Sequence, residues 1–289
     1  MVEWLPTLER REVPSPRMRV AAPLLAVLAI TATAPLAFAL LGLPPWSSLQ
    51  SFFISPVASL YGLGEWLLKA TPLALCGLGL ALGFRANVWN IGAEGQFTAG
   101  AIAGGGTALY VAPALGALGL PATLLAGVAG GMLWAAVPAW LRTRFNTSEI
   151  LTSLMLVYVA QLLLAWLMHG QWQDPAGFNY PQSRAFDDAL VLPVIGEGQR
   201  ATVAVWMVVA SMLAAWVLVH YSHLGFRMWV GGEAPAAARY AGFSESRSVW
   251  LGMLVSGGAA GLAGIAEVAG PIGRLQTSIS PGYGFAAII

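Results

Sequence analysis

Long hydrophobic segments alternate with short polar stretches along almost the whole chain. A transmembrane helix needs about 20 mostly apolar residues, and helices are expected because lipid offers no hydrogen-bond partner for an open sheet edge. The segments also lack the apolar–polar alternation of barrel strands. The pattern predicts an all-α, polytopic transmembrane helical bundle with seven spans, at residues 20–43, 67–84, 97–111, 118–140, 150–168, 201–220 and 249–269.

An eighth apolar segment begins near Tyr283, and the sequence stops at Ile289. A segment this short cannot span a bilayer whose hydrocarbon core is about 30 Å thick, so we expect the chain to be truncated at its C-terminus. Glycines at GxxxG spacing place small residues on one helix face, which predicts close helix packing. The pairs are Gly79 and Gly83, Gly100 and Gly104, Gly127 and Gly131, and Gly257 and Gly261.

The composition fits a lipid environment. Hydrophobic residues make up 57% of the chain, charged residues only 9%, and the mean hydropathy is +0.71, whereas about 25% of residues are charged in soluble domains. The net charge of +1 creates no basic field for nucleic acid, so no nucleic-acid partner is expected. The single cysteine, Cys76, can form neither an internal disulfide nor a zinc site alone.

Basic residues gather in alternate loops, which predicts the orientation because cytoplasmic loops carry more Lys and Arg. The tail, residues 1–19, has four arginines, and residues 44–66 have no Lys or Arg. We expect a cytoplasmic N-terminal tail, a transmembrane domain at 20–289, an outer loop at 169–200 and a cytoplasmic loop at 221–248. The first apolar segment exceeds a signal-peptide core of about 7–15 residues, so an uncleaved helix is expected.

A polar stretch at 85–96 separates two apolar spans with almost no loop. Its Asn and Gly residues weaken a continuous helix, and a carboxylate near the start of the next helix is favoured by the helix dipole. Broken helices at membrane depth often line a transport cavity, but an ordinary capped turn explains the pattern equally well. The candidate pathway residues in this stretch are Asn87, Trp89, Asn90, Glu94 and Gln96.

Glu267 is a second acidic residue within an apolar span, and we add it to the candidate pathway. Ionisable groups in the membrane are costly and tend to be functional. The alternative is that Glu267 pairs with Arg274 across the break at Gly270 and Pro271, or extends toward the interface. Lys69, near the start of its span, is expected to extend its ammonium toward the interface.

The loop 221–248 contains a predicted two-turn helix at 235–242. Proline suits the first turn of a helix, the alanines favour helix, and Gly242 is a natural stop. A helix this short is unstable alone, so it rests either on the bundle or on a partner protein. The residues that would face such a partner are Gly231, Gly232, Glu233, Ala237, Arg239, Tyr240 and Gly242.

Motifs for chemistry are missing from the sequence. The only lysine is Lys69, so the phosphate-binding pattern GxxxxGK[ST] does not occur. Neither GxSxG nor HExxH is present. We therefore predict no cofactor, no metal site and no enzymatic activity.

The segment Asn90-Ile91-Gly92-Ala93-Glu94-Gly95-Gln96, preceded by Phe84-Arg85-Ala86-Asn87-Val88-Trp89, resembles the signature of permeases in nucleoside and simple-sugar ABC importers. The wider family includes ribose and branched-chain amino acid permeases. The loop 231–243 resembles that family's coupling segment, with Glu233 in place of the usual Asn and Phe243 in place of the usual Ile. Residues 280–285 resemble a pattern in the last third of its fold.

The resemblance implies a membrane-spanning subunit of an ATP-driven importer in the bacterial inner (cytoplasmic) membrane, with nucleosides ranked above free sugars as solutes. It also implies three partners: an ABC ATPase that receives the coupling helix, a second permease chain of the same or a different kind, and an extracytoplasmic substrate-binding lipoprotein. Two alternatives stay open. An ion-coupled secondary transporter would use Glu94 and Glu267 as proton sites, and a membrane enzyme would need a catalytic constellation.

Overall fold

The computed structural model describes residues 15–289 and divides the chain into two compact units, Met1–Leu63 and Gly64–Ile289. In the first unit, α1 (Pro16–Leu40) is followed by α2 (Pro45–Leu49) and a short π-helix, η1 (Gln50–Ile54). None of the residues of α1 is buried. An apolar helix that buries none of its residues within its own unit is suited to a lipid environment.

The second unit is helical. Between residues 15 and 289 the structure contains no extended strand, only two isolated bridges, Gln182 with Gln276 and Val194 with Thr202. The prediction of an all-α fold is confirmed. The remaining elements are α3 (Leu60–Arg85), α4 (Ala93–Tyr110), η2 (Ala112–Leu118), α5 (Gly119–Phe145), α6 (Glu149–Met168), η3 (Asp188–Leu190), α7 (Ala204–Tyr221), α8 (His223–Glu233), α9 (Pro235–Tyr240), α10 (Glu245–Glu267), η4 (Val268–Ile272) and α11 (Tyr283–Ala286).

Six segments among the described residues are long and apolar enough to cross a membrane. They are Pro16–Leu40, Leu60–Arg85, Ala112–Phe145, Glu149–Met168, Ala204–Tyr221 and Glu245–Ile272. The predicted span at 97–111 corresponds to α4, which is not among the six, so the count of seven spans is not confirmed. Because α4 is enclosed by α5, α6 and α10, its many glycines and alanines contact protein and need little hydrophobicity of their own.

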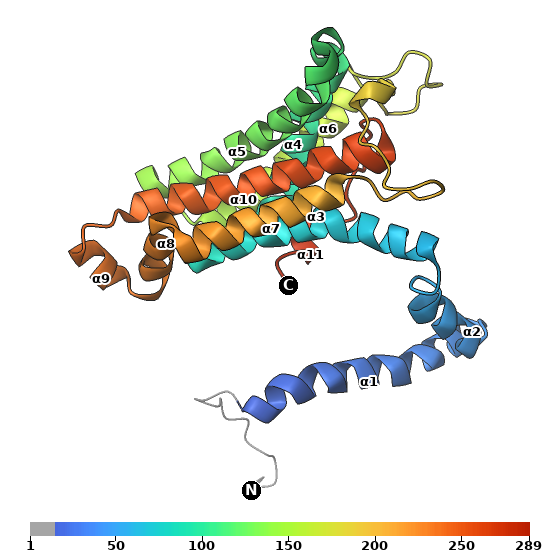
Figure 1. Cartoon of the computed structure of the whole chain (residues 1–289), viewed down its shortest axis with the longest axis horizontal. Helices are drawn as coiled ribbons and strands as arrows, with labels where there is room; N and C mark the ends of the chain where they lie inside the picture. The colour runs from blue at the N-terminus through green and yellow to red at the C-terminus, as the bar shows by residue number, and fades with distance from the viewer. Residues whose placement is uncertain (1–14) are drawn as a thin grey trace, which may run out of the picture. The chain divides into compact units, whose positions relative to one another are not determined.

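The centre of the bundle is formed by α4, α5 and α10, and α5 and α10 run beside each other in Figure 1. Glycines lie where α4, α5 and α10 contact one another. A Cβ atom placed on Gly261 would lie 2.9 Å from the Cα of Gly131, and one placed on Gly100 would lie 2.8 Å from the carbonyl oxygen of Gly127. The close packing predicted from the GxxxG spacing is confirmed for these pairs.

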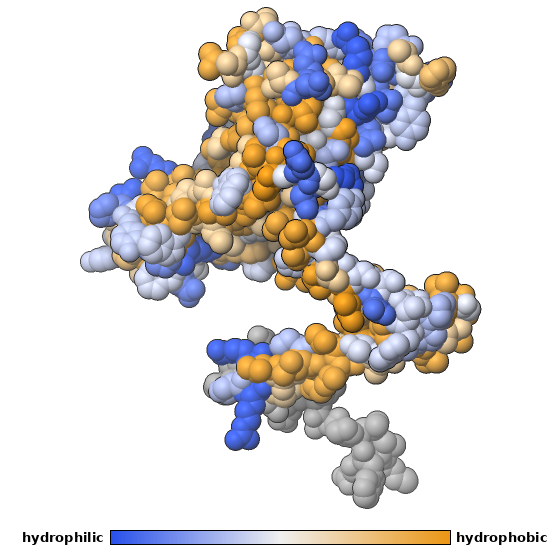
Figure 2. Space-filling model, turned by 45° about the vertical axis from the view of Figure 1, so that its right-hand side comes forward, coloured by the Kyte–Doolittle hydropathy of each residue, from blue (hydrophilic) through white to orange (hydrophobic). Residues whose placement is uncertain are grey.

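The two ends of α10 carry different structures (Figure 1). Helices α8 and α9 lie at one end. At the other, the connection between α6 and α7 lies against residues 269–276: Leu192 donates to the carbonyl of Ala269 at 2.7 Å, and Ser183 donates to that of Leu275 at 2.9 Å. Figure 2 shows hydrophobic residues over much of the visible face of the second unit, with strongly hydrophilic residues gathered toward its ends.

Candidate functional site

The interruption between two helices that was predicted at 85–96 is present, and we call it the break. Helix α3 ends at Arg85, and α4 begins at Ala93. Asn87 turns the chain with a φ of +56°, a left-handed conformation that asparagine adopts more readily than most residues. Asn87 and Trp89 are exposed, and the indole Nε1 of Trp89 donates to the Asn87 side-chain oxygen at 3.1 Å. The apolar span is therefore interrupted by a short ordered connection.

Asn90 holds this connection against two helices. Its amide nitrogen donates to Gln96 of α4 and to Ser256 of α10, each at 2.7 Å, and the Gln96 amide donates back to Asn90 at 3.0 Å. The Asn90 side-chain oxygen also accepts from the backbone N–H of Gly92 at 3.0 Å. Asn90 and Gln96 are each 1% exposed. We call Asn90, Gln96 and Ser256 the amide clasp.

Glu94 holds a different segment, the start of α11. Its carboxylate accepts from the backbone N–H of Gly284 at 2.7 Å. The Ser280 hydroxyl accepts from the backbone N–H groups of Gly282 and Tyr283, each at 3.0 Å. The ring of Tyr283 lies 6.0 Å from that of Phe97, between centroids. Glu94 thus joins the beginning of α4 to residues 280–285.

The structure therefore divides the candidate pathway residues into two groups. Asn87 and Trp89 are exposed, whereas Asn90, Glu94 and Gln96 are buried and bonded to other parts of the chain. Because these buried polar groups already have partners, they can reach a solute only after these hydrogen bonds open. Their place in a pathway stays a prediction.

Glu267 pairs with a different residue from the one that sequence alone suggested. Its carboxylate lies 3.8 Å from the ammonium of Lys69, not beside Arg274. The π-helix η4 and the left-handed turn at Gly273 separate Glu267 from Arg274 along the chain. Lys69 was expected to extend toward the interface, but it lies beside a carboxylate that is 5% exposed.

The predicted helix in the loop 221–248 is confirmed as α9. Its residue Ala238 is buried, Arg239 is exposed, and Tyr240 is 97% exposed. Gly242 has a φ of +77° and ends the helix, which is why glycine suits that position. Helix α8 was not predicted, although Ser222 signals its start: the hydroxyl accepts from the N–H of Gly225 at 3.0 Å.

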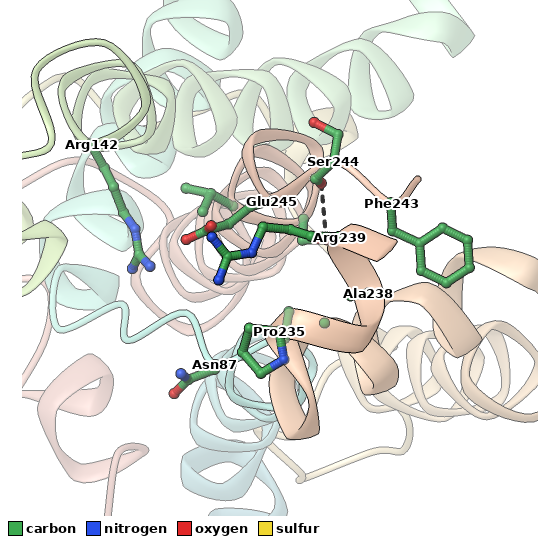
Figure 3. A pocket seen from close by; sticks show the side chains of 12 residues that line it. Asn87, Arg142, Pro235, Ala238, Arg239, Phe243, Ser244 and Glu245 are labelled. Carbon is green, nitrogen blue, oxygen red and sulfur yellow. Dashed lines mark hydrogen bonds between the residues drawn. The ribbon is translucent and has the colours of Figure 1, made fainter. Parts of the chain in front are cut away.

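The end of α8 packs directly on the break. A Cβ atom on Gly232 would lie 3.2 Å from the carbonyl carbon of Arg85 and 3.3 Å from the nitrogen of Asn87. A pocket lies beside this contact, and Arg142, Arg239 and Glu245 reach into it (Figure 3). It is lined by Ala86, Asn87, Arg142, Gly231, Pro235, Ala238, Arg239, Phe243, Ser244, Glu245, Ser248 and Val249.

An ion pair at the α5–α6 corner reaches the same break. Arg142 of α5 pairs with Glu149, the first residue of α6. The Glu149 carboxylate also accepts from the backbone N–H of Trp89 at 3.4 Å. Sequence analysis did not single out Arg142 or Glu149, because Glu149 is 60 positions from Trp89 in the chain. The break is therefore contacted by two helix pairs, α8–α9 and α5–α6.

Within residues 15–289, no group of three or more His, Cys, Asp or Glu side chains is placed to hold a metal ion.

Comparison with known proteins adds a family match. Residues 62–289 match the family described as branched-chain amino acid transport system / permease component. A glucose ABC transporter permease protein of Haloferax volcanii is 39% identical over 290 aligned residues, which cover 96% of this chain and 75% of the relative. A guanosine ABC transporter permease protein of Bacillus subtilis is 29% identical, with 85% of this chain and 70% of the relative covered.

A third relative is a probable riboflavin import permease protein of Treponema pallidum. It is 28% identical, and the alignment covers 84% of this chain and 64% of the relative. No solved structure matches the chain.

Proposed function

Because this chain belongs to the branched-chain amino acid transport system / permease component family, we propose that it imports a nucleoside or simple sugar by coupling α9 to a partner ATPase. The chain is a multi-pass membrane protein and the permease component of an ABC importer, a transport subunit rather than an enzyme. The family implies an ATPase and a substrate-binding protein as partners.

The observation that carries the coupling proposal is the contact between Gly232 and the break at Arg85–Asn87. A short helix with a fully exposed Tyr240 at its tip offers a docking surface, because exposed aromatic anchors often dominate protein interfaces. Because α9 follows α8 with no loop between them, a displacement of α9 also displaces the end of α8 that packs on the break. The hydrogen bonds of the amide clasp then transmit this displacement from the break to α4 and α10.

The proposed solute class rests on the relatives. Their names refer to glucose, guanosine, nucleosides and, in one probable case, riboflavin. Glucose and the nucleosides carry a ring with several hydroxyl groups. We propose alternating access in which Asn90, Glu94 and Gln96 contact such a solute after the clasp opens, with Asn87, Trp89 and Glu267 lining the same path. Weak contacts suffice, since a pathway must release what it admits.

The proposed assembly follows the same reasoning. A second permease chain, identical or different, completes the membrane part, and an extracytoplasmic lipoprotein delivers the solute. The N-terminus lies in the cytoplasm, and the complex lies in the inner (cytoplasmic) membrane of a bacterial cell. Under this orientation α9 faces the cytoplasm, the side on which ATP is available.

Reconstituted uptake tests the proposal. Proteoliposomes with the full complex should take up labelled guanosine or glucose when ATP is supplied to the ATPase side, and a protonophore should leave the rate unchanged. Uptake that a protonophore abolishes and that ATP does not affect would instead show an ion-coupled transporter, the alternative in which Glu94 and Glu267 carry protons.

A further inference from the structure

Three polar side chains converge near one end of α10. The Lys69 ammonium lies 3.8 Å from the Glu267 carboxylate, beyond the about 2.7–2.9 Å of a charge-assisted hydrogen bond. It also lies 5.9 Å from the centre of the Tyr283 ring. The Tyr283 hydroxyl is buried and has no hydrogen-bond partner among the described residues. We call Lys69, Glu267 and Tyr283 the polar triad.

The polar triad differs from the amide clasp in this respect. Each clasp side chain is bonded to another part of the chain, as expected for buried groups that serve structure. In the triad, a carboxylate that is 5% exposed and a buried hydroxyl face an ammonium whose side chain is 59% exposed. Converging polar groups with unused hydrogen-bonding capacity are typical of ligand sites.

The triad lies in the half of α3 that is remote from α8. Lys69 is 16 residues from Arg85, the end of α3 that contacts α8, which corresponds to about 24 Å along the helix at 1.5 Å per residue. A hydrocarbon core is about 30 Å thick, so the backbone of Lys69 is close to the edge of the core opposite Arg85. An ammonium facing lipid is costly, which favours a water-accessible position.

A second ion pair continues the polar face toward the α6–α7 connection. Arg200 lies 3.4 Å from Glu65, which is one helical turn from Lys69 on α3. Glu65 and Lys69 therefore share one face of α3.

We propose that the polar triad is a contact site for a polyhydroxylated solute, a sugar or the ribose of a nucleoside, on its way through the permease. This inference rests on the proposed function. The Lys69 ammonium and the Tyr283 hydroxyl donate to ring or hydroxyl oxygens of the solute, and the Glu267 carboxylate accepts from one of its hydroxyl groups. A site that hydrogen-bonds hydroxyls rejects analogues that lack them, since its own polar groups would be left unpaired.

Cysteine accessibility tests the proposal without requiring transport. Lys69→Cys is made in a Cys76→Ala background of the full-length chain, in its native complex in membranes, and is treated with a negatively charged methanethiosulfonate reagent. The thiol should react, and guanosine or glucose at about ten times its dissociation constant should slow the reaction about tenfold, since only the free site reacts. Leu162→Cys on α6, which is 70% exposed, is the lipid-facing control and should not react.

Two results would overturn the proposal. If Lys69→Cys does not react, the triad is not open to water. If it reacts at the same rate with and without both solutes, no sugar or nucleoside contacts it. Neither result depends on ATP, so both differ from a failure of the proposed function, which would appear as absent ATP-driven uptake by the native complex.

A kinetic measurement separates solute contact from a purely structural role. Tyr283→Phe removes only the hydroxyl, and Tyr158→Phe is the matched change on the exposed face of α6. Loss of one hydrogen bond to the solute should raise the KM for uptake about threefold to tenfold with Tyr283→Phe and leave it unchanged with Tyr158→Phe. Equal KM values for both variants and the native chain would show that the hydroxyl does not contact the solute.

Discussion

At the scale of single residues, the polar side chains discussed above form two kinds of cluster. Asn90, Gln96 and Ser256 bond to one another, and their exchange of hydrogen bonds fixes the break against two helices. Lys69 and Glu267 approach without forming a hydrogen bond. Sequence alone marks both kinds as polar residues in an apolar setting. Only the contacts separate residues that hold the fold from residues with hydrogen-bonding capacity to spare.

Gln96 of the amide clasp should contribute more to the free energy of unfolding than a glutamine at an exposed position. Gln96→Ala leaves the Asn90 side-chain oxygen and amide with fewer partners in a buried site. The expected cost is about 1–3 kcal/mol, which thermal unfolding of the detergent-solubilised chain would show as a lower midpoint. Gln161→Ala, at an exposed position of α6, is the matched control. Equal midpoints for the two variants would contradict a structural role for the clasp.

At the scale of elements, the connection from α3 to α4 is the point where three parts of the bundle meet. The end of α8 packs on Arg85–Asn87, Glu149 of α6 accepts from the Trp89 backbone, and Asn90 reaches α10. A short segment with contacts to several helices can pass a movement of one of them to the others. The coupling account therefore depends on how closely α8 packs on the break.

Adjacent glycines at the end of α8 test this packing. A Cβ on Gly232 meets backbone atoms of residues 85–87, whereas a Cβ on Gly231 meets only the Ser248 hydroxyl, at an ordinary 3.5 Å. Gly232→Ala should push α8 from the break and lower ATP-driven uptake severalfold without loss of bound ATPase. Gly231→Ala should transport normally. Equal uptake by the two variants in proteoliposomes would argue against transmission through this contact.

At the glycine contact between α5 and α10, an added methyl group should destabilise the protein, whereas the same change at an uncrowded glycine should not. Gly261→Ala places a methyl group 2.9 Å from the Cα of Gly131, and such overpacking costs about 1–3 kcal/mol. Gly77→Ala on α3 meets its nearest atom at 3.9 Å and should be neutral or stabilise by up to about 1 kcal/mol. Thermal unfolding of both variants measures the difference, and a Gly261→Ala protein as stable as the native one would mean that the helices separate easily.

Elements with a strong local signal could be predicted from the sequence. Asn and Gly in 85–96 predicted the break, and Pro235 with Gly242 predicted α9 and its end. Contacts between distant positions could not be predicted, because one sequence carries no record of which helices face each other. Asn90 and Ser256 are 166 residues apart, and Glu267 was given Arg274 as its partner because Arg274 is near in sequence, whereas the structure brings Lys69 to it.

At the scale of the whole molecule, the hydrophobic pattern and composition were sufficient for the fold class but not for the number of spans. Helix α4 is enclosed by other helices, so its residues need not be strongly apolar and its hydropathy is a poor guide to whether it spans the membrane. The family could be predicted because its signature lies in one continuous stretch, residues 84–96. The solute and the composition of the assembly depend on surfaces that meet other molecules, and hydrophobic periodicity contains no information about those.

The central claim is that this permease is driven by an ATPase through α9, and co-purification tests it most directly. The tagged full-length chain is isolated from membranes in mild detergent, beside Tyr240→Ala and the matched control Tyr158→Ala. Loss of an anchor worth about 2 kcal/mol weakens binding about 30-fold. We predict that the native chain and Tyr158→Ala recover an ABC ATPase and that Tyr240→Ala recovers little. Equal recovery by all three, or no ATPase with any of them, would contradict the account.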